Sequence, residues 1–253
     1  MKNEIIKSTP KINPKKLIII VRHAERKDRA GEIPQFHKMN PELTERGKLQ
    51  SFNASKILLE EIKNYGISEI SPDNIQIRTS PYMRTIQTAT YFIKGLNSTF
   101  SNNTNNNLLN KVYIDFSLRK RIKPNQKKAE DDDSLYSSVE AYKKFDEEIK
   151  NIEFVGGYGN FPTEIESKEQ TEKRTLEFID SILKDVVDDK NNRIKIIIII
   201  GHRGPIKFFF KKLGYECKDK KEVDYCSQYY FDVTDGIDNS KFLGKKKIPQ
   251  ITL

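Results

Sequence analysis

The sequence predicts an α/β fold: a three-layer sandwich in which helices cover both faces of a central, mostly parallel sheet. Two aliphatic runs, at residues 17–21 and 194–200, are typical of strands buried on both faces. Between and after these runs, strand patterns alternate with helix patterns, which is the signature of βαβ units. The chain of 253 residues is long enough to form one sizeable core.

The first helix pattern follows a capping residue. Thr44 is predicted to be the N-cap of a helix that runs up to Gly66, since a threonine side chain can accept a hydrogen bond from the first turn. Apolar residues at helical spacing are expected to form its core-facing side. They are Leu49, Phe52, Ile57 and Leu58.

The next segments are shorter. Residues 73–80 (DNIQIRTS) predict a strand, and residues 81–96 predict a helix with Pro81 in its first turn. The asparagine-rich residues 97–107 are expected to form a loop. Residues 111–118 (KVYIDFSL) predict another strand.

The second half of the chain begins with residues 119–167, which we expect to be irregular. A long amphipathic helix is predicted over residues 168–189, before the second aliphatic run. After that run, a helix is opened by Pro205 and closed by Gly214, and residues 229–234 predict a last strand.

This pattern predicts one domain over residues 16–234, with an insertion or cap at about 101–170. Residues 1–15 are expected to be an N-terminal tail and residues 235–253 a basic C-terminal tail.

The net charge of +9 favours anionic partners, such as a phosphorylated substrate or an acidic protein surface. Solvated lysine-rich faces are the simpler explanation for most of this charge. We do not expect a nucleic-acid partner, because no RNA-binding or base-stacking signature is present.

The sequence also predicts a cytoplasmic, reducing location. Cys217 and Cys226 form neither a CxxC motif nor a disulfide framework, and the N-terminus lacks the apolar core of a signal peptide. No apolar run reaches the roughly 18 residues that a membrane span needs. Three histidines without paired spacing argue against a metal site, and we expect no cofactor.

Two histidines end the two aliphatic runs, and arginines flank both. His23 and His202 fall at carboxyl ends of predicted strands, where ligands bind in open α/β sheets. Arg84 follows a third strand, and Arg22 precedes His23. Guanidinium groups match phosphate oxygens bidentately and a neutral imidazole is a competent nucleophile, so together these residues indicate a phosphate site.

Four segments resemble the motifs of the histidine phosphatase superfamily, also called phosphoglycerate mutase-like. VRHAER resembles its RHG motif, NPELTERGKLQS and TSPYMRTIQTA are similar to its next two segments, and IIGHRGPIK resembles its second-histidine motif. Their order and spacing agree over about residues 17–212. RHAER and SPYMRTIQTA lean towards the eukaryotic branch that contains the Sts phosphatases.

The resemblance implies a role for each matched residue. His23 would attack phosphorus and carry a phosphohistidine, while Arg22, Arg84 and His202 would hold the phosphoryl oxygens. No metal is needed for this chemistry.

One position departs from the pattern. Lys120 stands where the phosphoglycerate mutase-like branch has its glutamate general acid, and Arg203 stands where the acid-phosphatase branch has an aspartate. Loss of a positioned proton donor typically costs about 10²–10⁴ in rate. Residues 130–133 (EDDD) are an alternative source of an acid.

Two functions therefore remain open. One is a phosphomonoester hydrolase that acts through His23 and is impaired if Lys120 has replaced its acid. The other is an inactive phosphatase-like protein that binds a phosphorylated or acidic partner, or serves as a structural subunit of a larger assembly. A mutase is disfavoured, because it also needs the acid.

Overall fold

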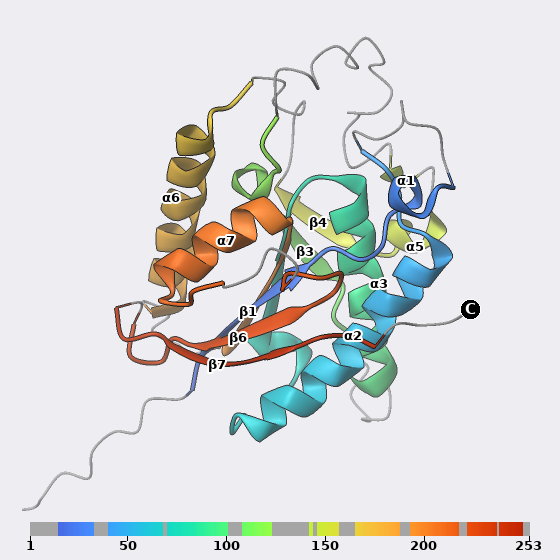
Figure 1. Ribbon diagram of the computed structural model, residues 1–253. Coiled ribbons are helices and arrows are strands. Elements are labelled where there is room, and N and C mark those ends of the chain that lie inside the picture. Colours follow the sequence, from blue (N-terminus) through green and yellow to red (C-terminus); the bar gives the residue numbers. More distant parts are fainter. Residues whose placement is uncertain are drawn as a thin grey trace, which may run out of the picture.

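The computed structural model describes residues 15–32, 40–67, 70–100, 108–122, 142–143, 146–156, 165–187, 193–217, 222–236 and 238–249. Within these residues one seven-stranded sheet runs through the molecule in the order β4-β3-β2-β5-β1-β6-β7 (Figure 1). The strands are β1 (Leu17–Arg22), β2 (Ile75–Thr79), β3 (Lys111–Ile114), β4 (Glu153–Gly156), β5 (Ile196–Gly201), β6 (Gln228–Asp232) and β7 (Lys241–Lys246). The first five strands in the sheet order are parallel to one another. β6 pairs antiparallel with β1, and β7 pairs antiparallel with β6.

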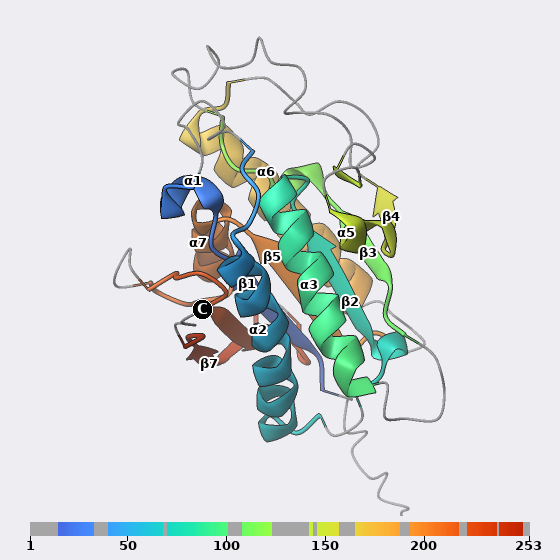
Figure 2. The same cartoon turned by 90° about the vertical axis from the view of Figure 1, so that its right-hand side faces the viewer.

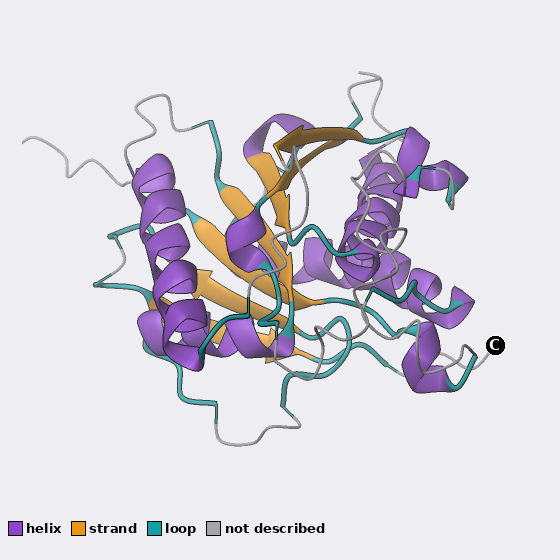
Figure 3. Ribbon diagram, turned by 90° about the horizontal axis from the view of Figure 1, so that it is seen from above, coloured by secondary structure: helices purple, strands orange, loops and turns teal. Residues whose placement is uncertain are grey.

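Helices cover both faces of the sheet, as the sequence predicts (Figures 2 and 3). The helices are α1 (Lys27–Ala30), α2 (Glu45–Asn64), α3 (Met83–Phe100), α5 (Glu147–Lys150), α6 (Lys168–Val187) and α7 (Arg203–Lys212), with 3₁₀ turns at Pro72–Asn74 and Phe116–Leu118. Alternate residues of β1 point to opposite faces. Ile19 packs in the core under α2 and α3, whereas Ile18 packs in the core under α6 and α7. The three-layer α/β prediction is confirmed.

The two aliphatic runs are neighbours in the sheet. β1 and β5 pair in parallel from Leu17 opposite Ile196 to Arg22 opposite Gly201. β5 begins at Ile196, two residues later than predicted, and all six of its residues are buried. The chain therefore leaves both strands at the same level of the sheet.

The cap of α2 is predicted correctly, and its buried face only in part. Thr44 Oγ1 accepts a hydrogen bond from the Gly47 amide at 2.8 Å. Leu58 is buried as predicted, whereas Phe52 and Ile57 are half-buried and Leu49 is 38% exposed. The buried face also includes the small residues Ser51, Ala54 and Ser55, where α2 packs closely on α3. Ser51 Oγ donates to the Thr88 carbonyl of α3 at 2.6 Å.

Helix α3 extends further than predicted. It ends at Phe100 rather than at residue 96, so residues 97–100 are not part of a loop. Leu96 and Phe100 lie one turn apart and are both buried, and the Asn97 side chain makes two hydrogen bonds to the backbone of Leu109. These contacts hold the polar end of the helix against the strand that follows.

The expectation of irregular structure over residues 119–167 is wrong for part of that range. α5 and β4 lie within it, and β4 pairs in parallel with β3, with Lys111 opposite Glu153 at an ion-pair distance of 3.1 Å. β4 has only four residues and lies between polar and glycine-rich segments, so its sequence pattern is too short to predict a strand. The expected insertion at 101–170 therefore supplies β3 and β4 to the sheet.

The expected basic tail also contains a strand. β7 pairs with β6, and Phe242 packs on Tyr215 with ring centroids 4.2 Å apart. Lys245 and Lys246 form ion pairs with Glu222 and Glu61. The lysines of this segment conceal the strand pattern, and its apolar residues are only partly covered: Leu243 is half-buried and Phe242 is 37% exposed. No helix in the described ranges is long and apolar enough to cross a bilayer.

The close packing of α2 on α3 predicts a sensitive glycine. A Cβ at Gly95 would lie 2.0 Å from Ser55 Oγ and 2.3 Å from the Phe52 carbonyl oxygen. Gly95→Ala should therefore lower the free energy of unfolding by about 1–3 kcal/mol, despite the better helix propensity of alanine. Urea denaturation measures this. The control is Gly204→Ala, whose Cβ meets no atom within 4 Å, and equal stability of the two variants would contradict the packing.

Candidate active site

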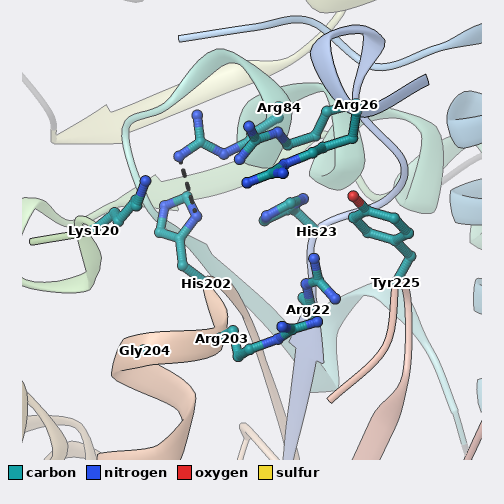
Figure 4. Close-up of a pocket in the computed structure, with 10 residues that line it drawn as sticks. Arg22, His23, Arg26, Arg84, Lys120, His202, Arg203, Gly204 and Tyr225 are labelled. Atoms are coloured by element: carbon teal, nitrogen blue, oxygen red, sulfur yellow. Dashed lines mark hydrogen bonds between the residues drawn. The ribbon is translucent and has the colours of Figure 1, made fainter. Parts of the chain in front are cut away.

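A cavity of about 450 Å³ lies at the carboxyl ends of the parallel strands (Figure 4). Its lining combines cations with two imidazoles and one phenol. The lining residues are Arg22, His23, Arg26, Arg29, Arg84, Lys120, His202, Arg203, Gly204 and Tyr225.

All five residues singled out by the sequence line this one cavity. Four strand ends bring them together: Lys120 follows β3, Arg84 lies in the first turn of α3 after β2, His202 follows β5, and Arg22 with His23 ends β1. The rings of His23 and His202 lie 5.4 Å apart between centroids, although 179 positions separate them in the sequence. One phosphate can contact both rings at that spacing.

The proton of His23 is placed by the backbone. Its Nδ1 lies 2.8 Å from the carbonyl oxygen of Ala24, which can only accept, so Nδ1 carries the hydrogen and Nε2 keeps its lone pair. Burial, and then the guanidinium of Arg84, hold the pKa of His23 well below its ordinary value of 6.5. The ring is therefore neutral at pH 7, with Nε2 as its basic atom.

His202 is equally buried and also neutral. Its Nε2 lies 2.8 Å from Ser80 Oγ, and Arg84 Nη2 donates towards its Nδ1 at 3.5 Å. Since arginine can only donate, Nδ1 is the acceptor in this arrangement and Nε2 donates to the serine. Burial, followed by the charge of Arg84, holds the pKa of His202 well below 6.5.

Arg84 and Arg22 are buried cations, and each stacks on a tyrosine ring. The Arg84 guanidinium lies 4.4 Å from the centre of the Tyr82 ring, and burial, followed by the charge of Arg26, lowers its pKa to about 9. Arg22 stacks 4.1 Å from the centre of the Tyr225 ring and donates from Nη1 to the Val223 carbonyl at 2.9 Å. Burial, followed by the charge of Arg203, lowers the pKa of Arg22 to about 10.

Sequence reasoning missed Arg26, Arg29 and Tyr225. Arg26 lies three residues after His23 in the same motif, and that spacing could have identified it. In Figure 4 its guanidinium lies beside His23 and Arg84. Tyr225 had no sequence signal, because it reaches the cavity only through the antiparallel placement of β6 beside β1.

No carboxylate lines the cavity within the described residues. The nearest acidic groups along the chain are held by arginines: Asp28 accepts from Arg26, and Glu25 from Arg46. Residues 130–133, the alternative source of an acid, lie outside the described residues. No group of three metal-ligating side chains occurs within the described ranges.

The sequence matches the family model described as the histidine phosphatase superfamily (branch 2) over residues 34–193, more than half of the chain. The protein belongs to the histidine phosphatase superfamily. The matched segment begins after His23 and ends before His202. The assignment of these two histidines to the site is therefore based on the strand-end motifs and on the structure, and not on the family model. No curated protein sequence gives a significant match.

Solved structures show that this member of the superfamily shares its fold with phosphoglycerate mutase-like proteins. The ecdysone phosphate phosphatase from Bombix mori, in complex with tungstate, aligns with a TM-score of 0.59 at 14% identity, covering 94% of this chain and 95% of that one. A phosphoglycerate mutase from Bacillus anthracis aligns with a TM-score of 0.52 at 16% identity, covering 91% and 92%. The Sts-type branch stays a prediction.

The neutral histidines predict an acid-sensitive fold. Unfolded histidines take up protons below about pH 6.5, whereas buried His23 and His202 do not, so the free energy of unfolding should fall as the pH falls through that value. The loss should be about 1.4 kcal/mol per histidine for each pH unit below about 6.5, until the folded form is protonated as well.

Urea denaturation at pH 7.5 and 5.5 measures this dependence. The variant His23→Gln/His202→Gln should lose less stability on acidification than the wild type. The same loss in both proteins would show that the two rings are protonated in the folded state.

Proposed function

We propose that the protein hydrolyses phosphomonoesters through a phosphohistidine on His23 Nε2. The observation that carries this proposal is the hydrogen bond between His23 Nδ1 and the Ala24 carbonyl, which leaves the Nε2 lone pair available inside a cavity lined by arginines. A neutral imidazole held in this way is a nucleophile at pH 7.

The arginines supply the electrostatics of the transfer. Arg22, Arg84 and Arg26 would bind the phosphoryl oxygens and stabilise the charge that develops on them as Nε2 bonds to phosphorus and the ester oxygen departs. With the ester bound, Arg84 Nη2 would donate to a phosphoryl oxygen instead of to His202 Nδ1. The Ser80 hydroxyl would then donate to Nε2, so that His202 carries its proton on Nδ1 and donates it to a phosphoryl oxygen. Water then attacks the phosphohistidine, which releases phosphate and restores His23.

Lys120 would limit the rate at which the leaving group is protonated in this reaction. It lines the cavity, and its charge helps to lower the pKa of His202. By the resemblance, it stands at the position of the general acid. An ammonium group is a far weaker acid than a carboxylic acid, so it protonates a leaving oxygen poorly at neutral pH. We therefore propose a phosphatase that favours leaving groups needing little protonation.

The second candidate is a phosphatase-like protein that binds a phosphorylated or acidic partner without turning it over, alone or within an assembly. The absence of a lining carboxylate in the described part of the cavity favours it. Both candidates require the same anion site, and they differ in whether phosphate leaves.

The anion site predicts tight vanadate binding. Arg84→Ala should weaken it by about 1.5–3 kcal/mol, the contribution of a charge-assisted hydrogen bond. Arg84→Lys should lose part of this affinity, because lysine keeps the positive charge but lacks the planar guanidinium that can donate to two oxygens at once. Isothermal calorimetry measures both, with Arg78→Ala on β2, outside the cavity, as the control. Unchanged vanadate affinity in Arg84→Ala would show that the anion binds elsewhere.

Lys120 predicts a dependence on the leaving group. Wild type should hydrolyse phenyl phosphate but turn over an alkyl phosphate slowly, and Lys120→Glu should raise the alkyl rate more than the aryl rate. Steady-state assays of both substrates test this, with His23→Ala as the inactive control. Fast alkyl turnover by wild type would show that another acid serves, with residues 130–133 the first to substitute. No turnover by either protein would favour the binding function.

A further inference from the structure

One short segment, residues 223–227, leads into β6 and holds the side chain of Arg22. We call this segment the Arg22 clasp. The Val223 carbonyl accepts a hydrogen bond from Arg22 Nη1 at 2.9 Å, and the guanidinium carbon lies 4.1 Å from the centre of the Tyr225 ring. In Figure 4 the Arg22 side chain lies beside Tyr225 and next to His23. The clasp therefore fixes one nitrogen and one face of the guanidinium.

These contacts leave one edge of the guanidinium for a ligand. Since Nη1 is engaged, the remaining pair of parallel donors is Nε and Nη2. Arg22 Nε is buried and has no hydrogen-bond partner within the described residues. The same edge of Arg174 donates to both carboxylate oxygens of Glu166, at 2.9 Å each. An edge of this kind can bind two oxygens of a phosphoryl group in the same way.

A β-turn at Asp224–Ser227 sets the direction of the Tyr225 ring. The Ser227 amide closes the turn by donating to the Asp224 carbonyl at 3.2 Å, and the Cys226 amide donates to the Arg22 carbonyl at 3.0 Å. Cys226 occupies the third position of the turn with a φ of 52°, and it is the one non-glycine residue with positive φ in the described ranges. Glycine is usual at such a position, because L side chains disfavour this backbone conformation.

The buried thiol explains why a strained residue can stand there. The Cys226 side chain is fully buried in the core under α2 and α3, so its packing offsets the backbone strain. Cys226 thus anchors the turn in the core, while the preceding residue, Tyr225, lines the cavity. The turn directs two neighbouring side chains to two different places.

We propose that Tyr225 is a positioning residue whose ring orients the Nε and Nη2 edge of Arg22 towards the reacting phosphoryl group. The inference rests on the proposed function, in which Arg22 binds phosphoryl oxygens. An arginine side chain has many rotamers, so holding its guanidinium before the anion arrives removes part of the ordering cost of binding. Tyr82 stands in the same relation to Arg84, with the ring centre 4.4 Å from the guanidinium carbon.

Vanadate affinity of two Tyr225 variants tests the role of the ring. Tyr225→Leu should weaken vanadate binding about fivefold or more, the effect of losing a cation–π contact at a half-buried site. Tyr225→Phe should keep most of the affinity, because the ring remains. Isothermal calorimetry measures both, and urea denaturation checks that each variant is folded. An equal loss in the two variants would overturn the proposal, because the hydroxyl and not the ring would then matter.

A second background shows whether Tyr225 acts through Arg22. In Arg22→Gln, the further change Tyr225→Leu should cost little vanadate affinity, because the guanidinium that the ring orients is gone. In Arg84→Gln, where Arg22 is intact, Tyr225→Leu should again cost about fivefold. The same loss in both backgrounds would overturn the proposal, since the ring would then act on the anion or on the fold and not on Arg22.

Variants of Cys226 test the turn independently, and they decide the matter if Tyr225→Leu does not fold. Glycine adopts positive φ freely, whereas a β-branched residue strongly disfavours it. Cys226→Val should therefore bind vanadate about fivefold more weakly than Cys226→Gly, because the turn shifts and the ring leaves Arg22. Equal vanadate affinity in these two variants would show that the turn does not position the ring.

Two further outcomes separate this inference from the proposed function. Vanadate affinity that is unchanged in Tyr225→Leu would overturn the positioning role and leave the proposed function intact. A wild-type protein that binds no vanadate would instead overturn the proposed function, because Arg22 would have no anion to hold.

Discussion

The in-register pairing of β1 with β5 is the constraint on which the site depends. It places Arg22 opposite Gly201, and the His23 amide continues the ladder by donating to the Gly201 carbonyl at 3.0 Å. β2 pairs with the other edge of β5 up to Thr79 opposite Ile200, so Ser80 arrives at the same level. A slip of one residue would turn a strand's side chains to the opposite faces of the sheet and separate the two imidazoles.

Neutral groups contact both buried arginines of the cavity. Arg22 is fixed by a carbonyl and an aromatic face, and Arg84 by the face of Tyr82, whereas elsewhere Arg119 and Arg174 share the carboxylate of Glu166. Burying cations beside π faces and carbonyls costs free energy that a bound anion recovers. No carboxylate lines the described part of the cavity. Under the proposed function, this one feature would both favour anion binding and slow the protonation of leaving groups.

The sequence predicted the features that strong local patterns encode. Aliphatic runs located β1 and β5, and strand-end motifs located His23, His202 and Arg84. It did not predict β7, whose lysines obscure the strand pattern, or the small residues on the buried face of α2, such as Ser55, which lies against Gly95 of α3. Tyr225 was also missed. Its place depends on how β6 pairs, which is a property of the assembled sheet and not of neighbouring residues.

Trapping the covalent intermediate tests phosphoryl transfer to His23 most directly. The protein would be mixed with phenyl [³²P]phosphate and quenched in alkali, which preserves phosphohistidine, and the digested peptides would then be sequenced by mass spectrometry. The geometry predicts a phosphoryl group on His23, bonded to Nε2 because Nδ1 is held by Ala24, and none in His23→Asn. A phosphoryl group on another residue, or bound phosphate without any phosphohistidine, would contradict this account.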